Sequence, residues 1–511
     1  MPRSADLDVN LGDLLDRSRP ADTPALIDCL DWEHPREYSH GEIDRLATEC
    51  ARGLLARGLE RGDAVAILAG NRAEFLIAYF GTMRAGLVSV PVNHKFPRDT
   101  IEFVMRDSAV KLVFCDHERR AQVPPGMPLI DFDSKGGDGF DALLDPGELA
   151  AVRAEPRETA MVLYTSGSTG RPKGVPLSHD GQLWAVRSRV AAAKDLDIQR
   201  FIVAAPLFHM NALGTSKVVF AGHAAIILLP QFDARRYIEA IGRFAVTFLT
   251  SVPTMMALIV RETGTLARTD LSSVRAVRMG SAPTTQQLID AVKRAFPGTV
   301  VSYIYGTTEA GPVMFGPHPD GRPQPDLALG WPRPRVEVRL VGPDGRDADE
   351  GMLWIRTPAN MTGYLNLPDK TKEVLTADGW YISGDILRRD PTGAYYFVGR
   401  ADDMFVCGGE NIYPGEVEAL LERHPDIIQA CVVPIPDEIK HEKPFAFVVT
   451  RNGRDLSEDA VKQYALAHAP AFQHPRHVVF MPELPLASTG KVDRVALRRR
   501  ALEHRQMERK A

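Results

Sequence analysis

The sequence predicts an α/β protein, with a large layered N-terminal domain followed by a small α+β domain. Before residue 100, short apolar segments typical of strands alternate with segments of helical periodicity, the pattern of a parallel sheet covered by helices. Similar apolar segments recur as far as residue 305, and the pattern changes near residue 400. Because 511 residues exceed what one hydrophobic core usually holds, we expect at least two domains.

The first elements are predicted from their periodicity. Over residues 43–55 the apolar side chains fall on one face of a helix, and Gly58 follows where that helix can end. A strand is expected from Ala64, then a helix over residues 75–83 and a strand over residues 87–92.

Three later apolar segments are predicted to be strands of the same kind, over residues 246–250, 274–279 and 300–305. Their loops are then delivered to one edge, which is where open α/β sheets bind their ligands.

The domain boundary is predicted at residues 401–403, so that residues 1–401 form one domain and residues 402–511 the other. In the small domain, strands are expected to begin near residues 404, 428, 445 and 478, with helices over residues 416–423 and 456–468. Asp455 and Glu458 predict a capping box for the second of these helices.

The composition argues against several classes of partner. A formal charge of −5 gives no overall attraction to nucleic acid or to an anionic membrane. Five scattered cysteines without CxxC spacing argue against a disulfide framework or a structural zinc site. No signal peptide and no membrane-spanning stretch is recognisable, so we expect a cytoplasmic protein, either a monomer or a homodimer.

A glycine-rich segment, YTSGSTGRPKG at residues 164–174, follows a short apolar strand and predicts a polyphosphate-binding loop. Its glycines allow backbone N–H groups to approach oxygens, its hydroxyls donate, and its lysine supplies positive charge. The residues expected to bind are Thr165, Ser166, Gly167, Ser168, Thr169, Gly170 and Lys173. A Walker P-loop is excluded because Pro172 and Gly174 occupy its required positions, whereas an ordinary glycine–serine turn stays an alternative.

Four further motifs follow in order: YGTTE at residues 305–309, YISGD at 381–385, GRADD at 399–403 and STGKVDR at 488–494. Together with the glycine-rich loop, they resemble the adenylate-forming superfamily, which includes acyl-CoA synthetases, adenylation domains of nonribosomal peptide synthetases and firefly luciferase. The GGENIYP run at residues 408–414 is similar to that of stand-alone carboxylate–CoA ligases.

The resemblance implies two half-reactions. A carboxylate and ATP form an acyl-adenylate and pyrophosphate, and the thiol of CoA then forms acyl-CoA and AMP. Mg²⁺ is implied as the metal, held by Glu309, with Thr308 donating to the α-phosphate. Taken singly, Glu309 could equally be a surface carboxylate.

The resemblance also implies how the nucleotide is held. Tyr305 is expected to stack on adenine, followed by Gly306 and Thr307, with the loop of Gly280, Ser281, Ala282 and Pro283 on the other side. Asp385 corresponds to the residue that accepts from both ribose hydroxyls, and Arg400 to the one that assists ribose and phosphate. Lys491 corresponds to the lysine that bridges the α-phosphate and the carboxylate. A core tyrosine and a turn aspartate are the plainer readings of Tyr305 and Asp385.

For the second half-reaction, the resemblance implies that the small domain rotates about a hinge at Asp402. Gly408 and Gly409 are expected to line the pantetheine channel. Many relatives carry a tryptophan in a D-E-x-W-G stretch, where this chain has Lys440. Lys440 and Arg476 are therefore candidates to pair with the CoA phosphates, and Cys407 is expected to be structural rather than nucleophilic.

The acyl pocket implied by the resemblance is mainly apolar and consists of His209, Met210, Asn211, Phe248, Met279, Ile304, Gly311 and Pro312. His209 is expected beside the carboxylate, or else as a satisfied core histidine. The expected substrate is a neutral aromatic or short-to-medium aliphatic acid. A dicarboxylate that uses Arg278 is the alternative, but strand alternation from Met279 predicts that Arg278 faces away from the pocket.

Two other functions stay open at this point. One is an adenylating enzyme that loads a carrier-protein thiol, which the missing tryptophan at Lys440 permits. The other is a non-catalytic protein that binds a nucleotide or acyl-CoA, against which the presence of Lys173, Glu309, Asp385 and Lys491 argues.

Overall fold

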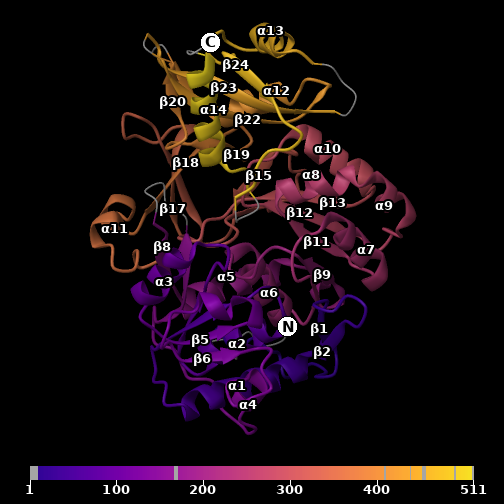
Figure 1. Cartoon of the computed structure of the whole chain (residues 1–511), viewed down its shortest axis with the longest axis vertical. Helices are drawn as coiled ribbons and strands as arrows, with labels where there is room; N and C mark the ends of the chain where they lie inside the picture. The colour runs from indigo at the N-terminus through magenta and orange to yellow at the C-terminus, as the bar shows by residue number, and fades with distance from the viewer. Residues whose placement is uncertain are drawn as a thin grey trace.

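The computed structural model describes residues 10–165, 171–407, 410–437, 439–451, 456–487 and 491–508. It is a mixed α/β protein in which the C-terminal part lies at one end of the molecule, above the large N-terminal part (Figure 1). Within these residues the strands form four sheets, three in the N-terminal part and one in the C-terminal part.

The largest sheet has the order β13-β12-β11-β9-β10-β1-β2 and is parallel except for β2. Its strands are β1 (Pro24–Asp28), β2 (Arg36–Ser39), β9 (Arg200–Val203), β10 (Ala225–Leu228), β11 (Phe248–Ser251), β12 (Ala276–Gly280) and β13 (Val300–Ile304). The three strands predicted near residues 246–305 are therefore confirmed as neighbours, and their carboxyl ends meet at one edge.

A second sheet has the order β6-β5-β3-β4-β7-β8. Its strands are β3 (Ala64–Leu68), β4 (Val88–Pro91), β5 (Val110–Cys115), β6 (Leu129–Asp131), β7 (Thr159–Thr165) and β8 (Lys173–Ser178). The antiparallel pair β7–β8 sets Thr165 opposite Lys173, which brings both ends of the glycine-rich segment together.

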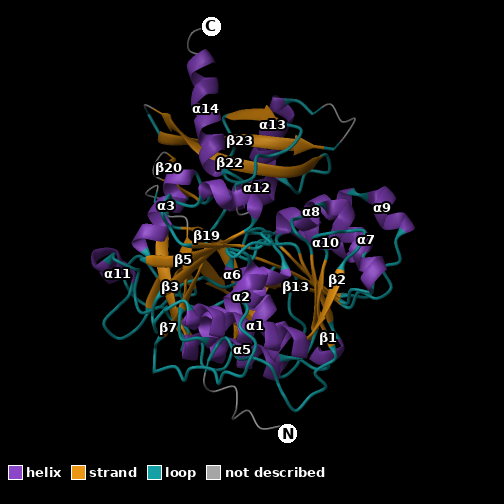
Figure 2. Ribbon diagram, turned by 60° about the horizontal axis from the view of Figure 1, so that its bottom comes forward, coloured by secondary structure: helices purple, strands orange, loops and turns teal. Residues whose placement is uncertain are grey.

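Four helices lie between these two sheets, as Figure 2 shows: α1 (His40–Ala56), α2 (Ala73–Arg84), α5 (His179–Ala192) and α6 (Met210–Ala221). They are buried on most sides, and their apolar residues join those of both sheets in one core. Ser39 caps α1 by accepting a hydrogen bond from the backbone of Glu42. The helix therefore begins at His40, three residues before the predicted start at residue 43.

Other helices cover the outer faces of the two sheets. The outer face of the seven-stranded sheet is covered by α7 (Ala234–Phe244), α8 (Pro253–Arg261), α9 (Thr263–Arg268) and α10 (Gln286–Ala295), which form a second core with it. On the other sheet, α3 (Arg98–Asp107) packs against β5. Short helices α4 (Phe140–Leu143) and α11 (Pro368–Val374) lie in connections.

The third sheet is antiparallel, with the order β14-β15-β19-β18-β17-β16. Its strands are β14 (Phe315–Gly316), β15 (Ala328–Pro332), β16 (Glu337–Val341), β17 (Glu350–Arg356), β18 (Tyr381–Arg389) and β19 (Tyr395–Arg400). Its last strand in the sequence is β19, and residues 401–404 lead from this strand directly into the C-terminal part.

The C-terminal part is the α+β unit that the sequence predicts, with two apolar cores of its own. Its strands are β20 (Phe405–Cys407), β21 (Glu410–Ile412), β22 (Ile427–Asp437), β23 (His441–Thr450) and β24 (His477–Phe480), and its helices α12 (Pro414–Leu421), α13 (Glu458–His468) and α14 (Arg494–Glu508). The capping prediction for α13 is wrong, because Ser457 is the N-cap and accepts from the backbone of Ala460; Asp455 lies outside the described residues.

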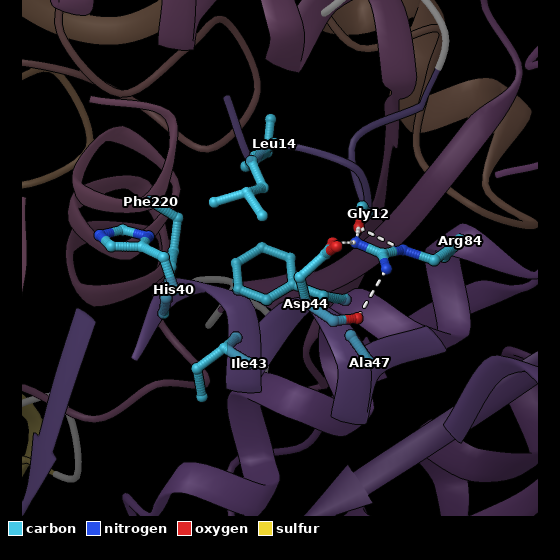
Figure 3. A pocket seen from close by; sticks show the side chains of 10 residues that line it. Gly12, Leu14, His40, Ile43, Asp44, Ala47, Arg84 and Phe220 are labelled. Atoms are coloured by element: carbon cyan, nitrogen blue, oxygen red, sulfur yellow. Dashed lines mark hydrogen bonds and ion pairs between the residues drawn. The ribbon is translucent and has the colours of Figure 1, made fainter. Parts of the chain in front are cut away.

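The N-terminal segment is fixed by Arg84 of α2. Its guanidinium donates to the carbonyl of Gly12 at 2.9 Å and contacts Asp44 of α1 at 2.7 Å (Figure 3). The neighbouring cavity measures about 20 Å³, room for one water molecule, and its walls include Leu14, Ile43 and Phe220. This feature stabilises the segment and is too small to bind a metabolite.

Candidate active site

The turn after β13 carries the YGTTE motif and is held in one shape. Thr307 and Gly311 exchange two backbone hydrogen bonds of 3.1 Å, and Gly311 has a φ of +118° that favours glycine. At Gly306 a side chain would collide with the carbonyl of Pro312. The backbone of Met361 also donates to the carbonyl of Glu309 at 2.7 Å. Glu309 is thereby fixed at the carboxyl edge of the sheet.

Glu309 is connected to Lys173 through Tyr364. The Tyr364 hydroxyl donates to Oε1 of Glu309 at 3.0 Å, and Nζ of Lys173 lies 3.5 Å from the same hydroxyl and 4.4 Å from the ring centre. Burial first, and then the negative charge of Glu309, raise the pKa of Tyr364. The phenol of Tyr364 therefore stays protonated and connects the carboxylate of Glu309, which follows β13, with the ammonium of Lys173 in β8.

Tyr305, Asp385 and Arg400 form a second group. The Tyr305 hydroxyl donates to Oδ2 of Asp385, and Arg400, which pairs with Asp385 across β18 and β19, places its Nη1 3.6 Å from Oδ1. Burial is the largest cause raising the pKa of Asp385, and Arg400 opposes it. The two predicted nucleotide residues of the YGTTE and YISGD motifs thus touch, although 80 positions separate them.

Lys491 reaches this group from the C-terminal part. Its carbonyl accepts from the backbone of Ala487 at 2.7 Å. Lys491 is exposed over part of its length, but nearby protein atoms reduce the hydration of its ammonium, and this is the main cause that lowers its pKa. Arg400 lowers the pKa further, whereas Asp385 raises it. The structure therefore brings Lys491 to the predicted nucleotide residues.

His209 is the N-cap of α6, and the charge of Lys491 acts on it. Burial first, and then the charge of Lys491, lower its pKa to about 4, so the imidazole is neutral near pH 7. Its buried Nε2 has no hydrogen-bond partner among the described residues. His209 is therefore not the satisfied core histidine of the alternative interpretation, and it has one ring nitrogen free for a ligand.

The first turn of α6 meets the loop after β12 close to His209 in the chain. Nδ2 of Asn211 donates to the hydroxyl of Ser281 at 3.2 Å, and Ser281 has the left-handed φ of +67° that turns the chain after β12. Gly280 packs so closely that an added Cβ would lie 2.7 Å from Ile304. The loop of Gly280 to Pro283 thus lies between the predicted nucleotide and acyl residues.

The glycine-rich segment is described only at its ends. Ser166, Gly167, Ser168, Thr169 and Gly170 lie outside the described residues. Thr165, at the end of β7, has a buried hydroxyl with no partner in the part of the chain that is described. An unpaired buried hydroxyl directly before such a loop is consistent with a ligand that supplies the partner.

The prediction for residues 278 and 279 is wrong. Met279 is fully buried in the core that the seven-stranded sheet forms with α7 to α10, on the face away from the cavity. Arg278 instead lies with its guanidinium 4.6 Å from the ring centre of Phe248, and both residues border a cavity. The two side chains do point to opposite faces of the strand, as predicted, but the faces are exchanged. Met279 lies on the face covered by helices, and Arg278 lies on the face of the cavity.

The cavity beside Arg278 has a volume of about 370 Å³ and lies against α5, α6 and the amino-terminal halves of β9, β11 and β12. Arginines line it besides apolar residues, and of the residues predicted for the acyl pocket its described lining contains Phe248. Met210, Ile304, Gly311 and Pro312 lie instead at the start of α6, at the end of β13 and in the turn after it.

Of the predicted CoA residues, Lys440 precedes β23 and Arg476 precedes β24, and both act electrostatically on His474. Nη1 of Arg476 lies 2.5 Å from Nε2 of His474, and both cations lower the pKa of His474, after burial as the larger cause. Beside them, Ile439 is 91% exposed. Gly408 and Gly409 lie outside the described residues, and Cys407 is buried, which agrees with a structural role.

Asp402 lies in the exposed turn between β19 and β20. Its carboxylate is 3.7 Å from Nη2 of Arg400, the residue that also contacts Asp385. A hinge at this position would therefore be coupled to the predicted ribose site by one shared arginine.

No three His, Cys, Asp or Glu side chains gather as a metal cage within the described residues. Glu309 alone fits Mg²⁺, because Mg²⁺ in such enzymes takes one or two carboxylates and completes its shell with phosphates and water. No helix in the described ranges is both long and apolar enough to cross a bilayer.

Three residues were missed at the sequence level: Tyr364, which contacts Glu309, and Arg189 and Arg333, which line the cavity. Arg189 carried a usable signal, since it continues the buried face of α5 from Ala185 and Val186 at helical spacing, where a charge is unusual. Tyr364 and Arg333 lie in connecting segments without periodicity, and only the folded chain brings them to the site.

The comparisons with known proteins agree with this geometry. The AMP-binding enzyme family matches residues 16–365, and the AMP-binding enzyme C-terminal domain matches residues 416–491. The chain is 31% identical over 494 residues to 4-coumarate–CoA ligase 1 of Solanum tuberosum, covering 92% of this chain and 90% of that protein. It is 31% identical over 473 residues to indoleacetate–CoA ligase of Aromatoleum aromaticum, covering 89% and 92%.

Among solved structures, ATP-bound MatB from Rhodopseudomonas palustris is similar, with a TM-score of 0.87, 28% identity, and coverage of 96% of this chain and 98% of that chain. The family match covers well over half of the sequence, and the relatives match along nearly their whole length. The chain therefore belongs to the AMP-binding enzyme family, as an adenylate-forming acyl-CoA synthetase.

Proposed function

We propose that this enzyme activates a carboxylic acid with ATP and Mg²⁺ and transfers the acyl group to CoA, using the residues described above. The observation that carries the proposal is the convergence of Lys173, Glu309, Asp385, Arg400 and Lys491 on one site, with Lys491 supplied by the C-terminal part. Both anionic reactants would need such charge, since a carboxylate oxygen must approach the α-phosphorus of ATP.

In the first half-reaction, the new bond joins the carboxylate oxygen to the α-phosphorus, and the bond from that phosphorus to pyrophosphate breaks. Lys491, whose charge acts on the neutral His209 and which interacts with Asp385, would contact both the α-phosphate and the carboxylate. Lys173 and the hydroxyl of Thr308 would contact phosphate oxygens. Mg²⁺, held by Glu309, would neutralise charge on the phosphates.

The nucleotide would be held by the second group of residues. Asp385 would accept from the ribose hydroxyls, while its contact with Tyr305 fixes the aromatic ring proposed to stack on adenine. Arg400 supports this carboxylate from the neighbouring strand and also contacts Asp402. The relatives that act on 4-coumarate and indoleacetate support an aromatic acid as the substrate of this chain.

In the second half-reaction, the thiol of CoA attacks the acyl carbonyl, and AMP leaves. Removal of Lys491 from the site, by rotation at Asp402, would open the approach for the thiol. Lys440 and Arg476, which both act electrostatically on His474 in the C-terminal part, are proposed to contact CoA phosphates.

Transfer to a carrier-protein thiol is the second candidate, and the observation that favours it is Lys440 in place of the tryptophan of many relatives. The two are separated by measuring pyrophosphate release and thioester formation with a panel of carboxylic acids, with and without free CoA. Our proposal expects acid-dependent pyrophosphate release and an acyl-CoA product. Release of pyrophosphate without any thioester from free CoA would favour the carrier protein, and the absence of release with every acid would contradict both.

A further inference from the structure

We propose that the acid activated by this enzyme carries a second anionic group at its far end, and that Arg189, Arg278 and Arg333 bind this group. The inference rests on the proposed function as a carboxylate–CoA ligase and names its substrate class as dicarboxylic acids.

The three guanidinium groups line one cavity. Arg189 comes from α5, Arg278 from β12, and Arg333 from the segment after β15, and all three border the volume of about 370 Å³ described above. The rest of the wall includes the rings of Phe201 and Phe248, which stack with centres 4.4 Å apart. The cavity thus has flat apolar walls and five cationic side chains, because Lys194 and Arg275 border it as well.

These charges lack an anion. No carboxylate within the described residues forms an ion pair with any of the three arginines. Nη1 of Arg278 is buried and has no hydrogen-bond partner in the described part of the chain. Arg189 donates to the carbonyl of Gly214 at 3.1 Å, and Arg333 donates to the carbonyl of Phe315 at 3.2 Å. Both acceptors are uncharged backbone groups.

Burial without a counter-ion is costly for a charge. Its effect is visible here, because burial, followed by the charge of Arg333, lowers the pKa of Arg278 to about 10. Nearby on α6, Lys217 is also buried, contacts only the neutral Gln182 among the described residues, and has its pKa lowered to about 7 by burial and then by Arg189. An anion in the cavity would remove this cost.

One wall of the cavity comes near the turn that carries Glu309. At Gly214 of α6, an added Cβ would lie 3.5 Å from Pro312 and 3.8 Å from Nη1 of Arg189. Pro312 ends the turn that carries Glu309, and α6 begins directly after His209. Gly214 is therefore close both to an arginine of the cavity and to the end of that turn.

The geometry also limits the length of the acid. Gly214 lies five positions after His209, the N-cap of α6, which corresponds to an axial rise of roughly 7.5 Å. An acid with its reacting carboxylate near His209 and a second one at Arg189, which donates to the carbonyl of Gly214, would have to bridge a distance of this order. A benzene ring with carboxylates at opposite positions, or a medium-length aliphatic dicarboxylate, meets this requirement, and the stacked phenylalanines suit the ring.

Matched pairs of acids test the inference in the wild-type enzyme. Pyrophosphate release would be measured with terephthalate against 4-methylbenzoate, and with adipate against hexanoate. We expect kcat/KM to favour the dicarboxylate by about a hundredfold in at least one pair, since a buried charge pair is worth this much. A preference for the monocarboxylate in both pairs would overturn the inference. The activity of the enzyme with the monocarboxylate would nevertheless leave the proposed ligase function intact.

Arg278→Met then tests the assigned residue, with Arg278→Lys as partial rescue and the exposed Arg294→Met on α10 as the matched control. We expect Arg278→Met to lower the ratio of the two kcat/KM values by about a hundredfold, and the control to leave it unchanged. An equal loss for both acids of a pair would overturn the assignment. If thermal unfolding shows that this variant does not fold, Arg333→Met is measured by the same criterion.

Binding without turnover gives an independent result. Calorimetry measures the affinity of terephthalate for the wild type and for each variant. This affinity can be measured even if none of the acids releases pyrophosphate, which is the outcome that contradicts the proposed function. Binding that Arg278→Met weakens at least tenfold supports the anion site, and binding that the variant leaves unchanged overturns it.

Discussion

At the scale of single residues, Asp385 is the clearest test of the nucleotide site. Replacing it with alanine removes the acceptor for the ribose hydroxyls and leaves the buried Tyr305 hydroxyl without its partner. We expect Asp385→Ala to weaken ATP binding by about 1.5–3 kcal/mol, the range for hydrogen bonds to charged groups. The measurement is the ATP dependence of pyrophosphate release, and the exposed Asp369→Ala is the control. Normal ATP dependence in Asp385→Ala would remove this residue from the site.

Tyr364 makes a second prediction at this scale. Tyr364→Phe keeps the ring beside Lys173 but removes the hydroxyl that donates to Glu309 at 3.0 Å. We expect the activation free energy of the Mg²⁺-dependent reaction to rise by about 1–3 kcal/mol, because the buried carboxylate of Glu309 loses a hydrogen-bond donor. Titration of activity with Mg²⁺ should show a higher metal requirement, as it should in Glu309→Gln. A normal metal requirement in both variants would mean that the metal binds elsewhere.

The residue scale is also where prediction from the sequence was weakest. The motifs identified Tyr305 and Asp385 as partners of one ligand, and the structure places them in contact. Alternation could not decide which of Arg278 and Met279 faces the cavity, because a strand between two layers offers an interior on both faces. That choice depends on which side the helices α7 to α10 cover, and this is a property of the assembled sheet.

At the scale of elements, the turn after β13 positions Glu309 and depends on Gly306. Gly306→Ala would bring a methyl group against the carbonyl of Pro312, and the backbone of the turn must shift to avoid it. We expect the variant to lose most of its adenylation activity while it stays folded, since the strain is local and costs about 1–3 kcal/mol. Pyrophosphate release and thermal unfolding are the two measurements.

Gly137→Ala is the matched control for that variant, because a methyl group at Gly137 meets nothing within 4 Å. Full activity in Gly306→Ala would show that the turn adapts and does not need glycine there. Elements such as α1 and β3 were predictable because periodicity and burial agree along them. The third sheet was not predicted, since its antiparallel strands are joined through pairings that only the fold reveals.

At the scale of the whole molecule, buried histidines predict loss of stability in acid. Burial lowers the pKa of His40 and of His179 to about 4, and Nδ1 of His179 must stay unprotonated because it accepts from the backbone of Leu11 at 3.0 Å. Between the ordinary histidine pKa of about 6.5 and pH 4, the unfolded chain binds more protons than the folded one. The free energy of unfolding therefore falls as the pH falls through this window.

We expect each of these two histidines to contribute about 2–3 kcal/mol to that loss. Urea unfolding at several pH values from 7 to 4.5 measures it. His179→Asn should flatten the pH dependence, whereas His34→Asn, at an exposed position, should not. An unchanged pH dependence in His179→Asn would show that this histidine is protonated in the folded protein.

The central claim for the whole molecule is that the C-terminal part delivers Lys491 to the nucleotide site for adenylation and withdraws it before CoA reacts. The described structure has Lys491 near Arg400, Asp385 and His209, the arrangement proposed for the first half-reaction. If the lysine acts only there, its removal should affect one half-reaction and not the other.

The most direct measurement compares Lys491→Ala with the wild type in the two half-reactions separately. Adenylation is followed as pyrophosphate release, and thioester formation is followed after presynthesised acyl-adenylate and CoA are supplied. We predict that adenylation slows at least about a hundredfold, because a cation that meets developing charge is worth several kcal/mol, while thioester formation stays within about threefold of the wild type. Equal damage to both half-reactions would contradict the account and would indicate a static site in which Lys491 serves throughout.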